Sequence, residues 1–213
     1  MTIAIFTIFI SSFIIALSGA IMPGPVLTVT ISESLRRGSI AGPLMILGHG
    51  ILELVLVLLL IAGLAPFFSH DTTFIVISLL GGLILGWMAY GMFQEIPSLT
   101  LQTEVPDKKQ KNLVMAGILL SIANPYWAIW WATIGIAYVL SSMKYGIPGV
   151  ISFFAGHVVG DLFWYALVSF SISRGSKFLS DTFYRRLISV CASFLVLFSA
   201  YFIFSGISRL AAA

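Results

Sequence analysis

The six residues Gly-His-Gly-Ile-Leu-Glu, at positions 48–53, lie in the middle of a long apolar run. A related stretch, Gly-His-Val-Val-Gly-Asp at positions 156–161, lies in a second apolar run. In each stretch a carboxylic acid follows a histidine by four residues, so a helix places both side chains on one face. An acid near the centre of an apolar segment is costly and usually marks an ion or substrate pathway. We therefore expect His49 with Glu53, and His157 with Asp161, to form a paired site.

The composition predicts an integral membrane protein made of helices. Of 213 residues, 59% are hydrophobic and only 9% are charged, whereas soluble domains are about a quarter charged. The apolar runs are long and unbroken, which excludes the alternating pattern of a transmembrane barrel. The net charge of +3 comes from basic residues in short loops, so we expect the lipid bilayer as partner and no nucleic acid. The single Cys191 excludes an intramolecular disulfide and a cysteine-based zinc cluster.

Six apolar segments each reach the ~20 residues needed to cross a bilayer. The first and the fourth are longer than the others, and both contain a helix-breaking sequence. The predicted spans are 3–31, 42–64, 73–93, 113–140, 147–170 and 187–207.

The loops predict the orientation of these spans. Nine of the 11 basic residues lie in loops on one side and two on the other, so the positive-inside rule places both termini outside the cytoplasm. We expect a multi-pass protein of the inner or plasma membrane. The richer side holds Arg36, Arg37, Lys108, Lys109, Lys111, Arg174, Lys177, Arg185 and Arg186, and the poorer side holds Lys144 and Arg209.

The two halves of the chain repeat each other. The His and acid positions recur at an offset of 108, and several positions of the third and sixth spans recur at 111. We therefore predict a three-helix repeat at 1–93, a polar cytoplasmic linker at 94–112 and a second three-helix repeat at 113–213. Because three spans is an odd number, the second repeat is inverted, as in many secondary transporters whose site lies between the repeats.

Two sequences interrupt the helical pattern, Pro23-Gly24-Pro25 in the first span and Asn124-Pro125 in the fourth. A proline kink is one interpretation. The other is a discontinuous helix whose second half begins near residue 26 or 126, with free N–H groups that face an anion. The first break comes later in its span than the second, so the symmetry is imperfect here.

The histidines and acids leave several interpretations open. Burial disfavours the charged form of Glu53 and Asp161, so they could bind a cation or relay protons; the alternative is a protonated, hydrogen-bonded acid. His49 and His157 either act with them or only pack, and all four side chains also make a plausible divalent-metal set. Three further groups of residues each have a functional and a purely structural interpretation. The hydroxyls of Thr28, Thr30 and Ser32 could line a path or bond to their own helix. The aromatic side chains of Tyr126, Trp127, Trp130 and Trp131 could wall a pocket but more often pack in the core or at the lipid interface, and Gly82, Gly86 and Gly91 fit close helix packing or a homodimer contact.

Four motifs occur in order: Pro-Gly-Pro at 23–25, Arg-Arg-Gly at 36–38, Gly48 with Glu53, and Asn-Pro at 124–125. Together they resemble the LysE-type superfamily, which includes lysine and homoserine–threonine exporters, over essentially the whole chain. The resemblance implies export of amino acids or related small solutes, with Glu53 at the position of the acid typical of the second span. Distant branches move metal cations. The histidines at both Gly-His positions depart from the commonest pattern.

We therefore expect a secondary transporter, rather than an enzyme, that exports amino acids at the expense of the proton motive force and needs no cofactor. The substrate carboxylate would meet the half-helix N-termini, and its ammonium would meet Glu53 and Asp161, whose protonation weakens that contact. The alternatives are a divalent-cation exporter and, ranked last, an intramembrane metalloenzyme, both using His49, Glu53, His157 and Asp161. Predicted substrate-binding residues are Pro23, Gly24, Pro25, Glu53, Asn124, Pro125 and Asp161; predicted proton-coupling residues are Glu53, Asp161, His49 and His157.

Overall fold

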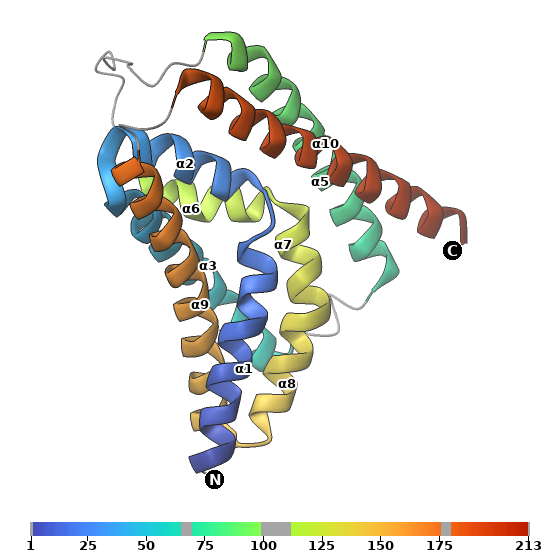
Figure 1. Cartoon of the computed structure of the whole chain (residues 1–213). Helices are drawn as coiled ribbons and strands as arrows, with labels where there is room; N and C mark the ends of the chain where they lie inside the picture. The colour runs from blue at the N-terminus through green and yellow to red at the C-terminus, as the bar shows by residue number, and fades with distance from the viewer. Residues whose placement is uncertain (1, 65–69, 99–111, 176–179, 213) are drawn as a thin grey trace.

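The computed structural model describes residues 2–64, 70–98, 112–175 and 180–212, which form helices joined by short turns (Figure 1). Five helices are long and apolar enough to cross a membrane, and a sixth span results when a bent pair is counted as one. The chain is an all-α membrane protein. Its elements are α1 (Thr2–Ala20), α2 (Pro25–Arg37), η1 (Gly38–Ile40), α3 (Ala41–Leu59), η2 (Leu60–Leu64), α5 (Asp71–Glu95), η3 (Ile96–Ser98), α6 (Leu113–Ile122), α7 (Pro125–Trp130), η4 (Trp131–Gly135), α8 (Ile136–Met143), α9 (Gly146–Gly175) and α10 (Asp181–Ala212).

Both predicted breaks are present. Each new helix begins with a proline, Pro25 in α2 and Pro125 in α7, because the first helical position needs no backbone N–H donor. The segments 113–122 and 125–143 are bent by 66°. In Figure 1 the short helices α2 and α6 lie across one end of α1, α7 and α9.

The unequal positions of the two breaks along their spans have a geometric reason. The first break follows the 19 residues of α1, and the second follows the 10 residues of α6. Because α1 and the α7–α8 segment run in opposite directions (Figure 1), a late break in one meets an early break in the other. A Cβ atom on Gly24 would lie 3.5 Å from Asn124 Nδ2. The two breaks therefore adjoin each other.

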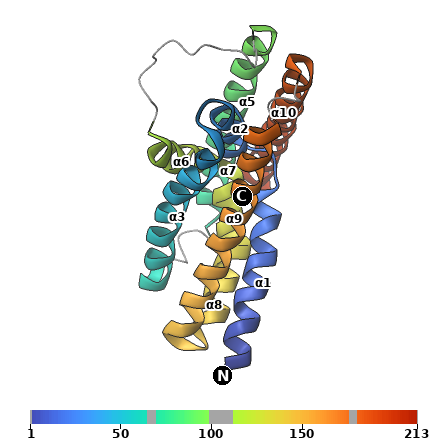
Figure 2. The ribbon, with the colours of Figure 1, turned by 60° about the vertical axis from the view of Figure 1, so that its left-hand side comes forward.

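The helix pairs have the pattern expected of a two-fold relation between the halves. The second and fifth spans, α3 and α9, pack together, and so do the third and sixth, α5 and α10. The first span contacts the fifth through α1 and α9, and the fourth contacts the second through α6 and α3 (Figure 2). This supports two repeats at 1–93 and 113–213, which stay a prediction. Most of the predicted linker at 94–112 lies outside the described residues.

Glycines let these helices touch backbone to backbone. A Cβ on Gly48 of α3 would overlap the carbonyl of Val114 in α6, and a Cβ on Gly156 of α9 would overlap the carbonyl of Phe9 in α1. The two glycines that precede His49 and His157 thus make equivalent backbone contacts, one in each half of the chain. A side chain at either position would push the helices apart and move the histidine next to it.

The helices α3 and α9 are tied closely at one end. A Cβ on Gly42 of α3 would overlap the carbonyl of Tyr165 in α9, and the Gly42 N–H donates to Ser169 Oγ over 2.7 Å. Towards their other ends both helices contribute large side chains to one buried apolar cluster, which includes Leu56 of α3 and Phe153 of α9. The contact is therefore rigid at one end and made of side chains at the other.

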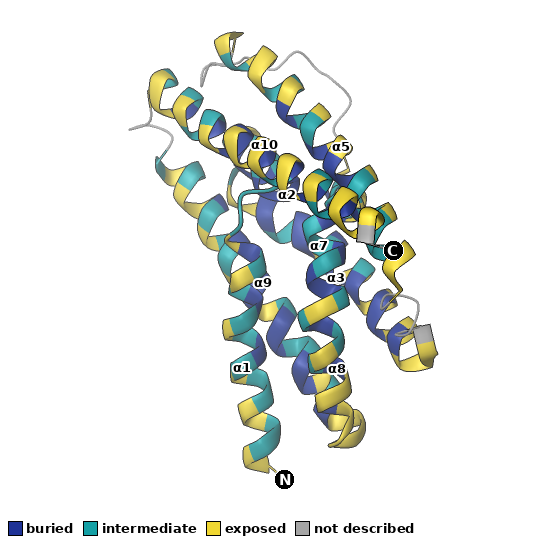
Figure 3. Ribbon diagram, turned by 90° about the vertical axis from the view of Figure 1, so that its right-hand side faces the viewer, coloured by how far each residue is buried: buried dark blue, intermediate teal, exposed yellow. Residues whose placement is uncertain are grey.

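The outer face of the bundle is apolar, as lipid requires. Figure 3 shows exposed residues along the outer sides of α5 and α10, among them Trp87 with 75% of its surface exposed and Phe204 with 71%. Gly82 faces α10 of the same chain, where Ser199 Oγ donates to its carbonyl over 2.7 Å. Helix packing is thus confirmed for this glycine, and the homodimer stays a prediction.

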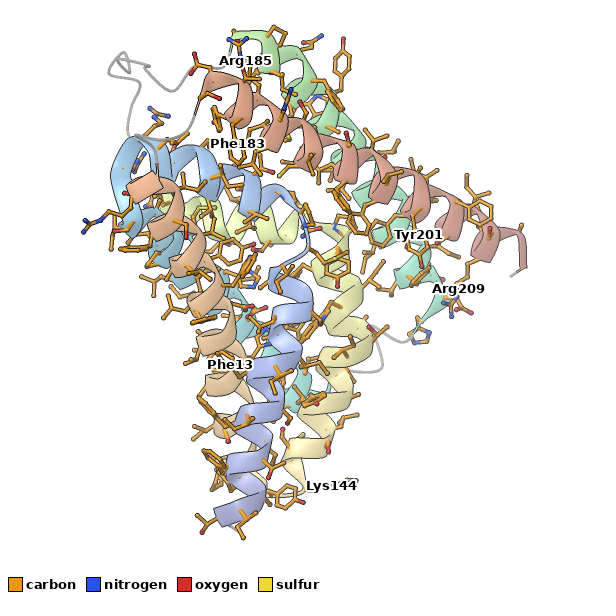
Figure 4. The ribbon with its side chains drawn as sticks, in the orientation of Figure 1. Phe13, Lys144, Phe183, Arg185, Tyr201 and Arg209 are labelled. Atoms are coloured by element: carbon orange, nitrogen blue, oxygen red, sulfur yellow. The ribbon has the colours of Figure 1, made fainter. Side chains whose placement is uncertain are left out.

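The charged helix ends lie in two separate regions of the molecule, and which of them faces the cytoplasm stays a prediction. Arg185 and Lys144 lie at opposite ends of the molecule (Figure 4). Arg37 precedes Gly38, whose Cβ position is 3.5 Å from Ser173 Oγ at the end of α9, so the basic ends of α2 and α9 adjoin. The predicted cytoplasmic residues Lys108, Lys109, Lys111 and Lys177 lie outside the described residues.

Candidate functional site

The structure brings the two histidine–acid pairs together where α3 and α9 pack. His49 Nε2 lies 3.0 Å from Glu53 Oε1 and 3.6 Å from Asp161 Oδ2. His157 Nε2 lies 3.2 Å from Glu53 Oε2 and 3.4 Å from Asp161 Oδ2. Each imidazole therefore contacts the acid of its own helix and the acid of the other. We call these four side chains the His–acid cluster.

The cluster is buried inside the protein. The residues Glu53, His157 and Asp161 expose only 1%, 3% and 4% of their surface. Glu53 Oε2 and Asp161 Oδ2 are buried and face the histidine Nε2 atoms at 3.2–3.6 Å, whereas the buried His157 Nδ1 makes no hydrogen bond among the described residues. Buried polar atoms are nearly always satisfied in proteins, so His157 Nδ1 is a place where a proton or a water molecule could bind.

The neighbouring Ser121 fixes which nitrogen of His49 carries its proton. Ser121 Oγ donates its hydrogen to the carbonyl of Gly117 over 2.6 Å. Its oxygen must then accept from His49 Nδ1, which lies 2.7 Å away. In the neutral imidazole, Nε2 is left with a lone pair that faces two acids. Two acids and a lone pair repel one another unless a proton or another cation lies among them.

Two tryptophans hold Glu53 in place. Trp131 Nε1 donates to Glu53 Oε1 over 2.8 Å, and Trp127 Nε1 donates to the same oxygen over 3.2 Å. The ring of Trp130 lies 4.9 Å from that of His157, centre to centre. Core packing is confirmed for Trp130 and Trp131, which are buried in one apolar cluster. The hydrogen bonds to Glu53 are an addition that the sequence did not predict.

A cavity adjoins the cluster and reaches the two helix breaks. The prolines Pro25 and Pro125 are buried where they begin α2 and α7. The other seven predicted site residues all line the cavity: Pro23, Gly24, His49, Glu53, Asn124, His157 and Asp161.

The two helix N-termini at this cavity differ. In α7 the first N–H group is already occupied, because Asn124 Oδ1 accepts from the Tyr126 N–H over 3.1 Å. The N-cap of α2 is Gly24, which has no side chain to make such a bond. The first N–H groups of α2, at Val26 and Leu27, thus lack a helical partner. The N–H groups at the start of α2 are therefore more open than those of α7, and anion binding at these two helix starts stays a prediction.

Sequence reasoning missed Ser121 and Tyr165, which both line the cavity. Tyr165 follows Asp161 by four residues, so helical spacing could have identified it. No pattern marks Ser121, which contacts His49 only through the packing of α6 on α3. The hydroxyls of Thr28 and Ser32 instead bond to their own helix, at the carbonyls of Gly24 and Val29.

Replacement of Trp131 by phenylalanine tests the support of Glu53. The ring packing is largely kept but the shorter N–H bond to Glu53 Oε1 is lost, so we expect about 1–3 kcal/mol of destabilisation and weaker substrate binding. Thermal unfolding of the purified protein and the concentration dependence of transport measure the two effects. Trp87→Phe on the lipid-facing side is the matched control, and equal behaviour of the two variants would contradict this role.

Comparison with known proteins agrees with this architecture. The family profile described as LysE type translocator matches residues 17–206. The chain is 27% identical to the "Chemotactic transduction protein ChpE" of Pseudomonas aeruginosa over 160 residues, 74% of this chain and 78% of that protein. It is 21% identical to the "Putative amino acid efflux protein YcgF" of Bacillus subtilis over 205 residues, 95% and 98% of the two chains. No solved structure matches the chain. From its motifs, its helical membrane fold and the profile match, the chain belongs to the LysE type translocator family of membrane transport proteins.

Proposed function

We propose that this translocator exports amino acids, or related small zwitterions, from the cytoplasm in exchange for protons. The observation that carries the proposal is the His–acid cluster, buried beside a cavity that also reaches the free N-terminus of α2. A zwitterion carries an ammonium and a carboxylate, and the cavity offers a partner of opposite charge for each. The relative named for amino acid efflux supports the solute class.

The ammonium group would bind between Glu53 and Asp161. Among the described residues that line the cavity there is no lysine or arginine, so no side-chain cation other than a protonated histidine competes for these acids. A bound ammonium would supply positive charge and hydrogen-bond donors to Glu53 Oε2 and Asp161 Oδ2 in place of the histidine Nε2 atoms that lie 3.2–3.6 Å from them.

The carboxylate group would bind at the start of α2. The backbone N–H groups there point out of the helix end and carry its positive partial charge. The amide group of Asn124 adjoins Gly24 and can donate from Nδ2, since its Oδ1 already accepts from Tyr126. Gly24 leaves this approach open because it has no side chain.

Protons would compete with the ammonium for the same cluster. When His49 Nε2 or an acid gains a proton, the net negative charge of the cluster falls and the ammonium is held less tightly. Protonation from the outer side would therefore release substrate there, and binding of substrate from the cytoplasm would release the proton inside. The inward proton gradient then drives export.

Reconstituted proteoliposomes test the function. Vesicles loaded with one labelled amino acid at a time should release it faster when the medium on the outer side of the protein is acidified, with a matching movement of protons that a trapped pH dye reports. Vesicles without protein are the control. If no amino acid is released faster under a proton gradient, the proposed function is wrong.

A further inference from the structure

Three of the four residues of the His–acid cluster have donor atoms that converge on one small region, and His157 lies beside them. His49 Nε2 and one oxygen each of Glu53 and Asp161 lie within 4.8 Å of one another. His157 Nε2 lies 3.2 Å from Glu53 Oε2 and 3.4 Å from Asp161 Oδ2. Imidazole nitrogen combined with carboxylate oxygen is a ligand set that suits first-row divalent metals such as Zn²⁺. The spacing is small enough for one ion to contact several of the groups.

The orientation of His49 is that of a metal ligand. Ligating histidines almost always donate their second ring N–H to a fixed acceptor, which leaves the other nitrogen's lone pair for the metal. Here His49 Nδ1 donates to Ser121 Oγ over 2.7 Å, and Ser121 in turn donates to the carbonyl of Gly117 over 2.6 Å. The lone pair of Nε2 therefore faces Glu53 and Asp161 without any cost of reorientation.

The charge balance of the cluster also favours a cation of charge two. The acids Glu53 and Asp161 are buried, and no lysine or arginine is found among the described cavity-lining residues. When both histidines are neutral, one divalent ion would neutralise both acids, and it would bind the oxygens Glu53 Oε2 and Asp161 Oδ2 that now face the histidine Nε2 atoms at 3.2–3.6 Å.

We propose that His49, Glu53, His157 and Asp161 bind one divalent first-row transition-metal ion, with Ser121 as the residue that orients His49. Hard ions such as Mg²⁺ and Ca²⁺ prefer all-oxygen ligands, so two imidazoles select against them. Because the metal occupies the place assigned to the substrate ammonium, metal and substrate exclude each other. This last consequence rests on the proposed function, whereas metal binding itself does not.

Binding of Zn²⁺ to the purified, chelator-treated full-length protein tests the proposal by titration calorimetry, with Co²⁺ as a spectroscopic substitute. We expect one ion per chain, at least tenfold weaker binding in His49→Ala, His157→Ala and Asp161→Asn, and no competition from Mg²⁺. Bound Co²⁺ should also quench tryptophan fluorescence, because Trp131 Nε1 lies 2.8 Å from Glu53 Oε1.

Two further variants separate a specific site from loss of folding or from surface binding. Ser121→Ala keeps all four ligands and should weaken Zn²⁺ binding by about 10-fold, the usual effect of removing an orienting partner. His70→Ala, at the exposed start of α5, should leave it unchanged. No binding by the wild-type protein, or binding that survives the combined His49→Ala and His157→Ala substitutions, would overturn the proposal. If the proteoliposomes are also prepared with a chelator, amino-acid release is measured without metal, so either result leaves the test of the proposed function intact.

Discussion

Replacement of Glu53 by glutamine is expected to abolish proton-coupled release of amino acids, and Asp161→Asn should do the same. Each variant keeps the size of the side chain but removes a negative charge that the substrate ammonium needs. Loss of one partner of a buried charged contact costs about 2–5 kcal/mol, which corresponds to at least 30-fold weaker binding. The release of labelled amino acid from proteoliposomes measures transport of the substrate. The pH inside the same vesicles measures the coupled movement of protons.

The control for both variants is Glu95→Gln, which removes an exposed acid at the end of α5 and should transport like the wild type. Size-exclusion chromatography of each detergent-purified variant shows whether it is folded. Should Glu53→Gln and Asp161→Asn both retain proton-coupled exchange, the assignment of ammonium and protons to this cluster would be wrong, even if the protein is an exporter.

Replacement of Gly48 or Gly156 by alanine is expected to have the largest effect on stability. The added methyl group would overlap a backbone carbonyl, of Val114 or Phe9 respectively, and a backbone cannot rotate away as a side chain can. Overpacking of this kind costs about 3 kcal/mol, which for a chain of this length lowers the midpoint of thermal unfolding by roughly 10 °C. Gly48→Ala should also weaken transport, because His49 and Ser121 separate when α3 moves away from α6.

The matched control is Gly91→Ala in α5, where nothing lies within 4 Å of the added methyl group. Alanine favours a helix by about 1 kcal/mol over glycine, so this variant should unfold at an equal or a higher temperature. Thermal unfolding curves of the three variants and the wild type in the same detergent show which substitutions lower the unfolding temperature. If all three unfold at the wild-type temperature, the helices do not depend on these backbone contacts.

The sequence predicted the fold class and the broken spans and marked the two His–acid motifs, because each leaves a direct signal. Apolar length indicates a span, proline ends a helix, and an intramembrane acid is too costly to be placed at random. The spacing of four residues between His49 and Glu53 was enough to put both on one helix face. That α3 and α9 turn these faces towards each other needed the structure.

The rest of the site depends on contacts between segments far apart in the chain. Ser121 and Trp131 approach His49 and Glu53 only because α6 packs on α3 and η4 continues α7 past the break. Tryptophans in a membrane span usually lie at the lipid interface or in the core, so their N–H bonds to an acid leave no local pattern. The capping of α7 by Asn124, by contrast, could have been predicted, because asparagine before a helix-starting proline is a favoured N-cap.

The tie between Gly42 and Ser169 limits how the two acid-bearing helices could swing. A pivot at this point leaves α3 and α9 free to part only at their opposite ends, where Leu56 and Phe153 belong to one buried apolar cluster. Glu53 lies about 16 Å along α3 from Gly42 at 1.5 Å per residue, so a tilt of about 10° would carry it roughly 3 Å from His157. A small change in the angle between α3 and α9 would thus be enough to separate the four side chains of the His–acid cluster.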